Sequence, residues 1–355
     1  MAARRPWRRA GGGQGMNRKH VMRAGTVALA AVVALGLMAC SSVKKEEGPA
    51  AGALTSVTLM LNWTPNNHHA GIYAALQNGW YRDEGIDLKI VEPAAAGADQ
   101  VVASGGADFG ISQAESLLPA RAAGAAVVSI ATLLPHNDSS FFALTSAGIK
   151  RPKDFEGKTY GGYGGPLERE LLSTLVKCDG GDPAKVKQVE VGNIDYLPGM
   201  EQQRFDFVWV FEGWDVLRAR EVEHKDVTSV KFTDWEKCVP DWYTPVVIAS
   251  EKTLKEQPDL VRKFLKATAR GYDLAIANPD QAATLLLKSA PELDKGLVTA
   301  SAKYHAPKYA AKGKAWGVQE VKVWTDFTAF LRKSGLLEKD VPANAAFTND
   351  FLPKK

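Results

Sequence analysis

Residues 56–91 read SVTLMLNWTPNNHHAGIYAALQNGWYRDEGIDLKIV, and this stretch predicts the fold class. An alternating apolar strand over 56–61 is followed by a polar loop and by a helix over 69–78 that stops at Gly79. A second strand follows over 86–91. A helix that connects two strands is the repeating unit of a mainly parallel sheet covered by helices. The stretch therefore predicts an α/β protein.

The same alternation continues downstream. Further strands are expected over 108–111, 127–133, 141–145, 186–191, 207–211 and 246–249, and further helices over 98–104, 114–123, 166–178, 258–277, 281–288 and 319–334. Roughly 300 residues exceed one typical hydrophobic core, which favours two lobes. We expect lobe I to comprise residues 55–145 and 247–355 and lobe II residues 146–246, with hinged crossovers near 143–150 and 245–249.

The N-terminal region has the composition of an export signal. Residues 1–23 are rich in Arg and Lys and hold no acidic residue, and an apolar run over 24–38 is shorter than the ~20 residues that a membrane span needs. The run ends in Leu-Met-Ala-Cys at Cys40, which resembles the lipobox of bacterial lipoproteins. We therefore expect residues 1–39 to be a lipoprotein signal peptide and Cys40 to be lipid-modified. A transmembrane anchor with an incidental Cys is the alternative.

A polar tether and a near-neutral mature chain follow from this interpretation. Residues 40–54 are small and polar and hold no aromatic residue, so they would form a lipid-anchored tether on the extracytoplasmic face of the cell membrane. The formal charge of +4 includes the basic block of the signal. Without that block the chain is near neutral or slightly acidic, and nucleic acid is not an implied partner.

Two further cysteines, Cys178 and Cys238, remain after the lipobox. In an oxidising compartment they form either a disulfide or two buried thiols, and the sequence leaves both open. Neither has a His or Cys nearby at metal-ligand spacing. We therefore expect no metal site and no cofactor.

Ligands of open α/β sheets bind beyond the carboxyl ends of the strands, where four loops of this chain carry polar and aromatic residues. In the first loop, 62–69, Asn62 offers an amide, Trp63 an aromatic face and His69 an imidazole. The alternative is a helix-capping turn with Asn67 as the cap and Trp63 in the core.

The second loop holds Ser112 and Glu115 at the spacing of a helix capping box, and a ligand would also find free N–H groups there. In the third loop, Gly162 and Gly164 let the main chain approach a ligand, Tyr163 can stack and Glu168 can accept hydrogen bonds. The alternative for the third loop is a tight turn with an exposed Glu168 in the first helical turn.

The fourth loop follows the apolar strand over 207–211. Glu212 comes directly after this strand and needs a polar partner, between Trp209 and Trp214. Tyr243 lies where the chain returns to lobe I. The four loops together offer aromatic faces and carboxylates but few cationic side chains. This composition disfavours sulfonate, nitrate or phosphate as the ligand. They favour a flat, neutral or weakly basic heterocycle that carries amino groups.

Five motifs in this order are similar to one known family: Asn62-Trp63-Thr64-Pro65-Asn66 with His69, Gly79-Trp80-Tyr81, Gly161-Gly162-Tyr163-Gly164, Asp206-Phe207-Val208-Trp209, and Asp241-Trp242-Tyr243-Thr244-Pro245. Over about Ser56 to Leu352 the chain resembles the bacterial receptors for thiamine pyrimidine precursors, which serve ABC importers. These receptors are related to the yeast thiamine pyrimidine synthase and more distantly to sulfonate- and nitrate-binding proteins.

The resemblance implies a two-lobed periplasmic-binding-protein fold of type II with the ligand cleft between the lobes. It implies a monomeric, non-enzymatic receptor for a formyl-aminomethyl- or hydroxymethyl-aminopyrimidine, with a permease and an ATPase as partners. Trp63 and Tyr163 would enclose the ring, and its amino groups and nitrogens would be bound by Asn62, His69, Glu168 and Glu212. His68 beside His69 leaves the choice of histidine open by one position.

Two other functions stay open. A receptor for another small solute, such as a riboflavin-like or other aromatic compound or a sulfonate, would use the same fold. A pyrimidine-synthesising enzyme is a different class, but the cysteine cluster of the yeast enzyme has no counterpart here, because Cys178 and Cys238 are isolated in sequence.

Overall fold

The computed structural model describes residues 54–93, 95–192 and 194–354. The predicted signal peptide, Cys40 and all but the last residue of the predicted tether lie outside the described residues. Within the described ranges, no helix has both the length and the apolar character that a bilayer span requires.

The first of two sheets has the strand order β2-β1-β3-β10-β4. Its strands are β1 (Thr55–Met60), β2 (Ile86–Val91), β3 (Phe109–Ser112), β4 (Val127–Thr132) and β10 (Val246–Ser250). β1 pairs in parallel with β2 and β3, whereas β10 is antiparallel to β3 and β4. All of β10 is buried, as expected for a central strand.

The second sheet has the order β7-β6-β8-β5-β9. Its strands are β5 (Ser139–Leu144), β6 (Thr159–Gly162), β7 (Lys187–Glu190), β8 (Phe207–Phe211) and β9 (Val227–Lys231). β6 is parallel to β7 and β8, and β5 is antiparallel to β8 and β9. The predicted mainly parallel sheet is thus two mixed sheets, because the strands that arrive from the other sheet, β5 and β10, enter in the opposite direction.

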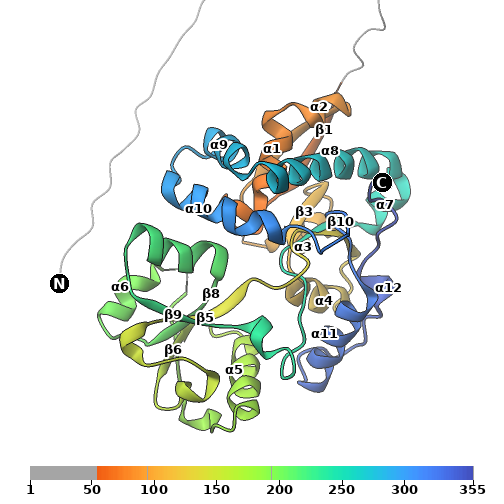
Figure 1. The fold of residues 1–355 in the computed structure, drawn as a ribbon. Coiled ribbons are helices and arrows are strands. Elements are labelled where there is room, and N and C mark those ends of the chain that lie inside the picture. The colour runs from red at the N-terminus through yellow and green to blue at the C-terminus, as the bar shows by residue number, and fades with distance from the viewer. Residues whose placement is uncertain (1–53, 94, 193, 355) are drawn as a thin grey trace, which may run out of the picture. The chain divides into compact units, whose positions relative to one another are not determined.

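Helices cover both sheets (Figure 1). They are α1 (Ala70–Gln77), α2 (Trp80–Asp83), α3 (Gly97–Ala103), α4 (Ala114–Ala122), α5 (Pro166–Cys178), α6 (Tyr196–Glu201), α7 (Glu251–Glu256), α8 (Pro258–Ala277), α9 (Pro279–Ser289), α10 (Lys295–His305), α11 (Val321–Lys333) and α12 (Ala343–Ala346). Shorter 3₁₀ turns include η1 (Asn67–His69) and η7 (Phe232–Trp235), and β8 runs into two π-helical turns, η5 (Glu212–Val216) and η6 (Arg218–Val222). The predicted helices over 166–178 and 258–277 match α5 and α8.

The chain passes between the sheets earlier than predicted. It leaves the first sheet at Thr132 and enters the second at Ser139, so the crossover expected near 143–150 is wrong. Ala143 lies inside β5, where Phe207 and Thr228 are its pairing partners. The return runs from the end of β9 to the start of β10, and the predicted lobe boundaries stay a prediction.

Long-range hydrogen bonds hold the loop before α1. The buried hydroxyl of Tyr272 on α8 donates to the carbonyl of His68 at 2.6 Å, and the hydroxyl of Tyr309 donates to the carbonyl of Asn67 at 2.5 Å. Tyr272 is packed close to α1, since a Cβ on Gly71 would lie 2.4 Å from its ring. The C-terminal helices therefore position a loop that is more than two hundred residues earlier in the chain.

Cys178 and Cys238 form a disulfide, with 6.0 Å between their Cα atoms. The bridge joins the end of α5 to the segment that returns from the second sheet to the first. Of the two arrangements that the sequence left open, the structure has the disulfide.

Candidate functional site

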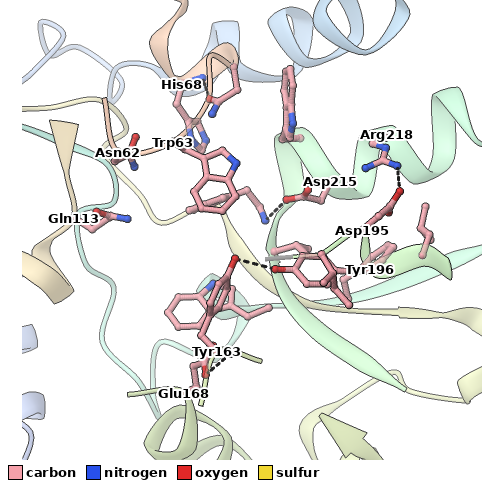
Figure 2. A pocket seen from close by; sticks show the side chains of 18 of the residues that line it. Asn62, Trp63, His68, Gln113, Tyr163, Glu168, Asp195, Tyr196, Asp215 and Arg218 are labelled. Carbon is pink, nitrogen blue, oxygen red and sulfur yellow. Dashed lines mark hydrogen bonds and ion pairs between the residues drawn. The ribbon is translucent and has the colours of Figure 1, made fainter. Parts of the chain in front are cut away.

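A cavity of about 560 Å³ lies where loops from both sheets meet. Its lining comprises Asn62, Trp63, Asn66, His68, Gln113, Glu115, Phe142, Tyr163, Glu168, Ile194, Asp195, Tyr196, Leu197, Trp209, Val210, Phe211, Trp214, Asp215 and Arg218. Figure 2 shows Trp63 and Tyr163 entering the cavity from opposite sides. This volume suits a small organic molecule.

The loop after β1 forms one wall through Asn62, Trp63 and His68. Asn66 shapes this loop, because its side-chain oxygen accepts from the N–H of His68 at 2.9 Å while its amide donates to the carbonyl of Thr64. Trp63 stays 42% exposed, so its indole is available to a ligand and is not part of the core. Asn66, and not Asn67, is the capping residue of this turn.

His68 and His69 have different positions, and the sequence left open which of the two reaches the site. His69 is fully buried and does not line the cavity; its Nε2 lies 3.0 Å from Oδ1 of Asn62. Burial lowers the pKa of His69 to about 3, so its imidazole is neutral. His69 therefore orients the amide of Asn62, and it is His68 that reaches the cavity wall.

The glycine-rich turn after β6 forms the opposite wall through Tyr163 and Glu168. Glu168 is buried rather than exposed. Its Oε1 accepts from the hydroxyl of Tyr160 at 3.1 Å, and its Oε2 accepts from the N–H of Gly165 at 3.1 Å. Both oxygens also accept from the N–H of Tyr163, at 3.1 and 3.0 Å. Because these donors occupy most of its acceptor capacity, Glu168 chiefly holds the turn that presents Tyr163.

Gly162 and Gly164 allow the turn to form and do not line the cavity. A Cβ on Gly162 would lie 2.4 Å from the ring of Tyr160, and Gly164 has a φ of +78°, which disfavours other residues. The sequence predicts that both glycines let the main chain approach a ligand. Instead, Gly162 allows close packing against Tyr160, and Gly164 allows a left-handed backbone conformation.

The predicted capping box of Ser112 and Glu115 is wrong. The helix begins one residue later than the box requires, with Gln113 as its N-cap, so Glu115 falls at the second helical position. Ser112 instead donates to both carboxylate oxygens of Asp99, at 2.8 Å each, and lies outside the cavity lining. Glu115 does line the cavity, and Nε1 of Trp242 donates to it at 2.9 Å.

The third wall comes from the end of β8 and its π-helical turns. Trp209 and Trp214, which the sequence named as candidate site residues, line the cavity. Asp215, which it did not name, lines the cavity as well. Glu212 does not line it: this carboxylate is buried, its Oε1 has no hydrogen-bond partner among the described residues, and Nζ of Lys231 lies 3.9 Å from Oε2. The π-helical geometry widens the turn and brings Asp215, three residues further on, to the cavity.

Tyr243 is buried and is not part of the cavity lining. Its hydroxyl accepts from the N–H of Glu320 at 2.8 Å. Since the ring also packs at 5.8 Å from that of Trp324, Tyr243 fixes the C-terminal region against the returning segment.

Sequence reasoning missed several lining residues that come from distant segments. Tyr196, at the start of α6, donates a hydrogen bond of 3.1 Å to the hydroxyl of Tyr163. Asp195 next to it pairs with Arg218 at 2.8 Å. Gln113 could have been predicted as a site residue, because it directly follows β3. No local sequence pattern marks Asp195, Tyr196 or Arg218.

The cavity is rich in carboxylates. Glu115, Glu168, Asp195 and Asp215 line it, and Arg218 is the one Lys or Arg among the described lining residues. Arg218 is already paired with Asp195 and, at 2.6 Å, with Glu223. Burial raises the pKa of Asp215 to about 6 and that of Glu115 to about 7. The site therefore offers hydrogen-bond acceptors and little positive charge.

The family described as NMT1/THI5 like matches residues 66–282. The chain belongs to this family. It is 28% identical over 305 residues to the formylaminopyrimidine-binding protein of Halalkalibacterium halodurans, covering 84% of this chain and 91% of that protein. It is 30% identical over 322 residues to the riboflavin-binding protein RibY of Chloroflexus aurantiacus, covering 84% of this chain and 87% of that protein.

A relative with an enzyme's name is about as similar. The 4-amino-5-hydroxymethyl-2-methylpyrimidine phosphate synthase of Legionella pneumophila is 27% identical over 300 residues, covering 84% of this chain and 92% of that protein. NMT1/THI5-like relatives thus carry names of both binding proteins and enzymes.

Solved structures agree on the fold. The aliphatic sulphonate-binding protein SsuA of Escherichia coli superposes with a TM-score of 0.65 at 16% identity, over 81% of this chain and 96% of that chain. The alkanesulfonate-binding protein SsuA of Xanthomonas axonopodis pv. citri superposes with a TM-score of 0.63 at 13% identity, over 82% and 98%. The predicted two-lobed periplasmic-binding fold of type II is confirmed.

Proposed function

We propose that this protein is the extracytoplasmic solute receptor of an ABC importer and that it binds an aminopyrimidine precursor of thiamine. The observation that carries the proposal is the cavity itself, in which Trp63 and Tyr163 remain 42% and 47% exposed beside a carboxylate-rich wall. A flat heteroaromatic ring would stack on the two aromatic side chains. Its exocyclic amine would donate to a carboxylate, which only accepts.

The acceptor for the amine is assigned to Asp215 in this proposal. Asp215 lines the cavity and takes one hydrogen bond from the protein, at 3.2 Å from the N–H of Phe211, so it keeps acceptor capacity. Glu168 has less to offer, since the turn uses both its oxygens. The amide of Asn62, oriented by His69, would bind a ring nitrogen.

The names of similar proteins support this class of solute. Formylaminopyrimidine and riboflavin are both flat nitrogen heterocycles, and both occur in the names of binding proteins that align over most of the chain. The same cavity argues against a sulfonate, because a sulfonate would meet several carboxylates and an arginine that is already paired.

A pyrimidine-synthesising enzyme is the second candidate, favoured by the similar synthases. The disulfide argues against the cysteine-dependent version of that chemistry, because Cys178 and Cys238 are bonded to each other and have no free thiolate. Receptor function predicts that the bound molecule is recovered chemically unchanged.

Isothermal titration calorimetry with a panel of solutes tests the proposal. We expect tight binding of formylaminopyrimidine or hydroxymethylpyrimidine, weaker binding of riboflavin and none of taurine. Mass spectrometry of the released ligand should return its original mass. Tight taurine binding with no response to either pyrimidine would overturn the solute class, and a changed ligand mass would favour the enzyme.

Membrane attachment through Cys40 is a further part of the proposal. The lipobox-like ending of the apolar run supplies the motif, and a lipid on Cys40 would keep the receptor beside its permease. Cys40→Ser should move the protein from the membrane fraction to the soluble extracytoplasmic fraction. Unchanged retention in the membrane would contradict lipidation at this residue.

A further inference from the structure

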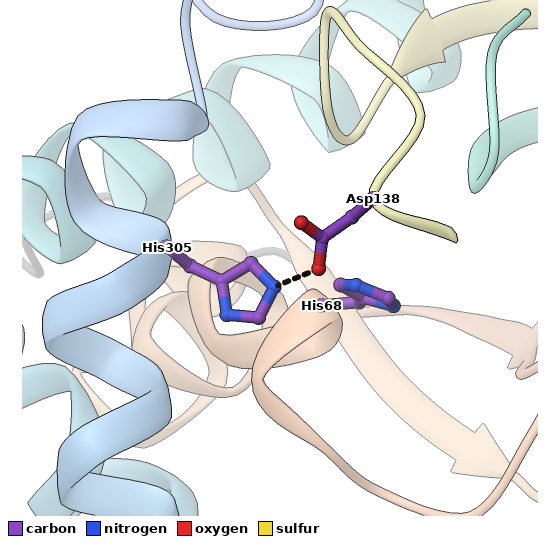
Figure 3. Close-up of side chains that lie close together, drawn as sticks. All are labelled: His68, Asp138 and His305. Carbon is purple, nitrogen blue, oxygen red and sulfur yellow. Dashed lines mark ion pairs between the residues drawn. The ribbon is translucent and has the colours of Figure 1, made fainter. Parts of the chain in front are cut away.

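Three buried side chains that can bind metal converge behind the cavity wall. They are His68 in η1, Asp138 in the segment that links the two sheets, and His305 at the end of α10 (Figure 3). The candidate ligand atoms all lie within 4.8 Å of one another, and Nε2 of His305 is 3.5 Å from Oδ2 of Asp138. None of the three residues is more than 8% exposed.

These separations suit one small cation. Zinc lies about 2.0–2.2 Å from its nitrogen and oxygen ligands, so tetrahedral ligand atoms are roughly 3.3 Å apart. The His305–Asp138 pair is already at this spacing. Movement of side chains on the order of 1 Å would bring all three to it.

Each of the two histidines of the cluster has a buried ring nitrogen without a hydrogen-bond partner in the part of the chain that the structure describes. Nε2 of His68 and Nε2 of His305 are both buried without a hydrogen-bond partner among the described residues. Nδ1 of His305 lies 2.9 Å from the carbonyl of Ser301, which fixes the proton on Nδ1 and leaves a lone pair on Nε2. That lone pair faces a carboxylate, an unfavourable contact unless a positive charge lies between them.

A divalent cation satisfies this arrangement better than a proton does. One proton shared between His305 and Asp138 would leave Nε2 of His68 unpaired in the interior, which carries a desolvation cost. A cation can accept lone pairs from two imidazoles and one carboxylate together.

Neighbouring groups orient the candidate ligands as outer-shell residues of metal sites do. Asp138 accepts from the hydroxyl of Tyr304 at 2.6 Å on Oδ1 and from the N–H of Gly213 at 2.7 Å on Oδ2. Gly213 also leaves space for the imidazole, since a Cβ there would lie 2.4 Å from Nε2 of His305.

We propose that His68, Asp138 and His305 form a binding site for one divalent cation of the zinc class. Two nitrogen ligands and one carboxylate oxygen are a set that zinc accepts, with a fourth position left for water or another donor. The three ligands come from three separate segments, so the cation fixes the η1 loop of the cavity wall to the segment that links the sheets. The sequence predicted no metal site, because these residues are far apart along the chain.

Metal titration of the full-length protein, purified in detergent and stripped with a chelator, tests the proposal. Zn²⁺ is titrated in competition with a chromophoric chelator, and Co²⁺ serves as a spectroscopic probe of nitrogen and oxygen ligands. We expect one tightly bound equivalent. His305→Gln and Asp138→Asn should each weaken the affinity by about 100-fold or more, because each removes a direct ligand.

The second cluster of potential ligands provides a matched control. His136, Glu236 and Asp241 also lie within 4.8 Å of one another, but His136 and Glu236 are exposed. His136→Gln should leave the tight equivalent unchanged. Loss of binding in this variant alone, or binding that survives both His305→Gln and Asp138→Asn, would assign the metal elsewhere and overturn the proposal, as would the absence of a tight equivalent in the unaltered protein.

A thermal readout separates metal loss from misfolding. Zn²⁺ should raise the melting temperature of the unaltered protein, because a ligand that binds only the folded state stabilises it. The His305→Gln and Asp138→Asn variants should melt cooperatively with no response to Zn²⁺. A full zinc-induced rise in both variants would contradict the site.

Discussion

Glu168 accepts two hydrogen bonds from the main-chain N–H of Tyr163, one on each carboxylate oxygen, at 3.1 and 3.0 Å. This relationship makes the acidic residue the internal support of the turn that presents the aromatic ring to the cavity. Because this buried carboxylate receives four donor contacts from the protein, its position is fixed by the fold and does not depend on a ligand.

Glu168→Gln should therefore lower the stability of the protein as well as its ligand affinity. The amide keeps one acceptor oxygen but turns a donor toward main-chain N–H groups, so we expect a loss of roughly 1–3 kcal/mol in the free energy of unfolding. Urea denaturation measures this loss. Glu190→Gln, on the exposed strand β7, is the control and should change stability by about 0.5 kcal/mol or less. Equal stability of the two variants would show that the turn does not depend on Glu168.

Trp63→Ala should mainly lower ligand affinity and should have only a small effect on the stability of the protein. The indole is half-exposed in the cavity, so little buried contact is lost in the free protein. We expect aminopyrimidine affinity to fall by about 5- to 13-fold, which corresponds to a lost stacking contact of about 1–1.5 kcal/mol. Calorimetry and thermal melting measure the two effects. Trp242→Ala, which removes a fully buried indole, should instead destabilise the fold strongly.

Asp215→Asn should weaken binding and stabilise the unliganded protein near pH 8. Burial raises the pKa of Asp215 to about 6, so the folded state holds a proton more tightly than the unfolded state does. The stabilising contribution of this carboxyl is thus present below its unfolded pKa of about 3.9 and is lost as the pH rises through about 6. Above that pH the folded protein carries a partly buried charge, which asparagine removes.

The pH dependence of binding follows from the same residue. Ligand affinity should rise between about pH 5 and about pH 8 as Asp215 ionises. Calorimetry at both pH values checks this change. Asp215→Asn should reduce it and leave the part that comes from ionisation of Glu115, whose pKa is about 7, whereas the exposed Asp234→Asn should leave the whole change in place. A pH profile that is identical in all three proteins would remove Asp215 from the proposed set of ligand contacts.

Loss of the disulfide should destabilise the protein without changing the cavity. The bridge closes a loop between positions 60 residues apart, and removing such a constraint typically costs about 2–4 kcal/mol. The double variant Cys178→Ser/Cys238→Ser should melt at a lower temperature and keep its ligand affinity, because neither cysteine lines the cavity. Labelling of the unaltered protein under denaturing, non-reducing conditions should find neither thiol free.

Local signals predicted much of the fold and part of the site. Proline at the first turn and a left-handed glycine near the end, Gly180, delimit α5, so its bounds could be read from the sequence. Tyr163 directly follows β6 and Trp63 lies three residues after β1, so both were expected at the carboxyl ends of strands, where the cavity lies. In contrast, α10 was missed because Gly296, Val298, Thr299 and Ser301 give its sequence a weak helical preference.

The remainder of the site depends on contacts that no local pattern reveals. Arg218 and Asp195 meet across 23 positions, and the two π-helical turns that carry Arg218 and Asp215 have no sequence signature. The choice between His68 and His69 is set by the 3₁₀ geometry of η1, because adjacent residues on a 3₁₀ turn point about 120° apart. An error of one position therefore replaces His68, which lines the cavity, by His69, which does not.

The interleaving of β10 between β3 and β4 sets an order of assembly for the chain. The second sheet uses one continuous stretch, residues 139–231, and can pair all its strands as soon as that stretch is available to fold. The first sheet cannot, because β10, which lies between β3 and β4, is its last strand to arrive. Until then β3 and β4 have unpaired edges that neighbouring chains can extend, so the incomplete chain should be prone to aggregation and the protein should not tolerate truncation before residue 250.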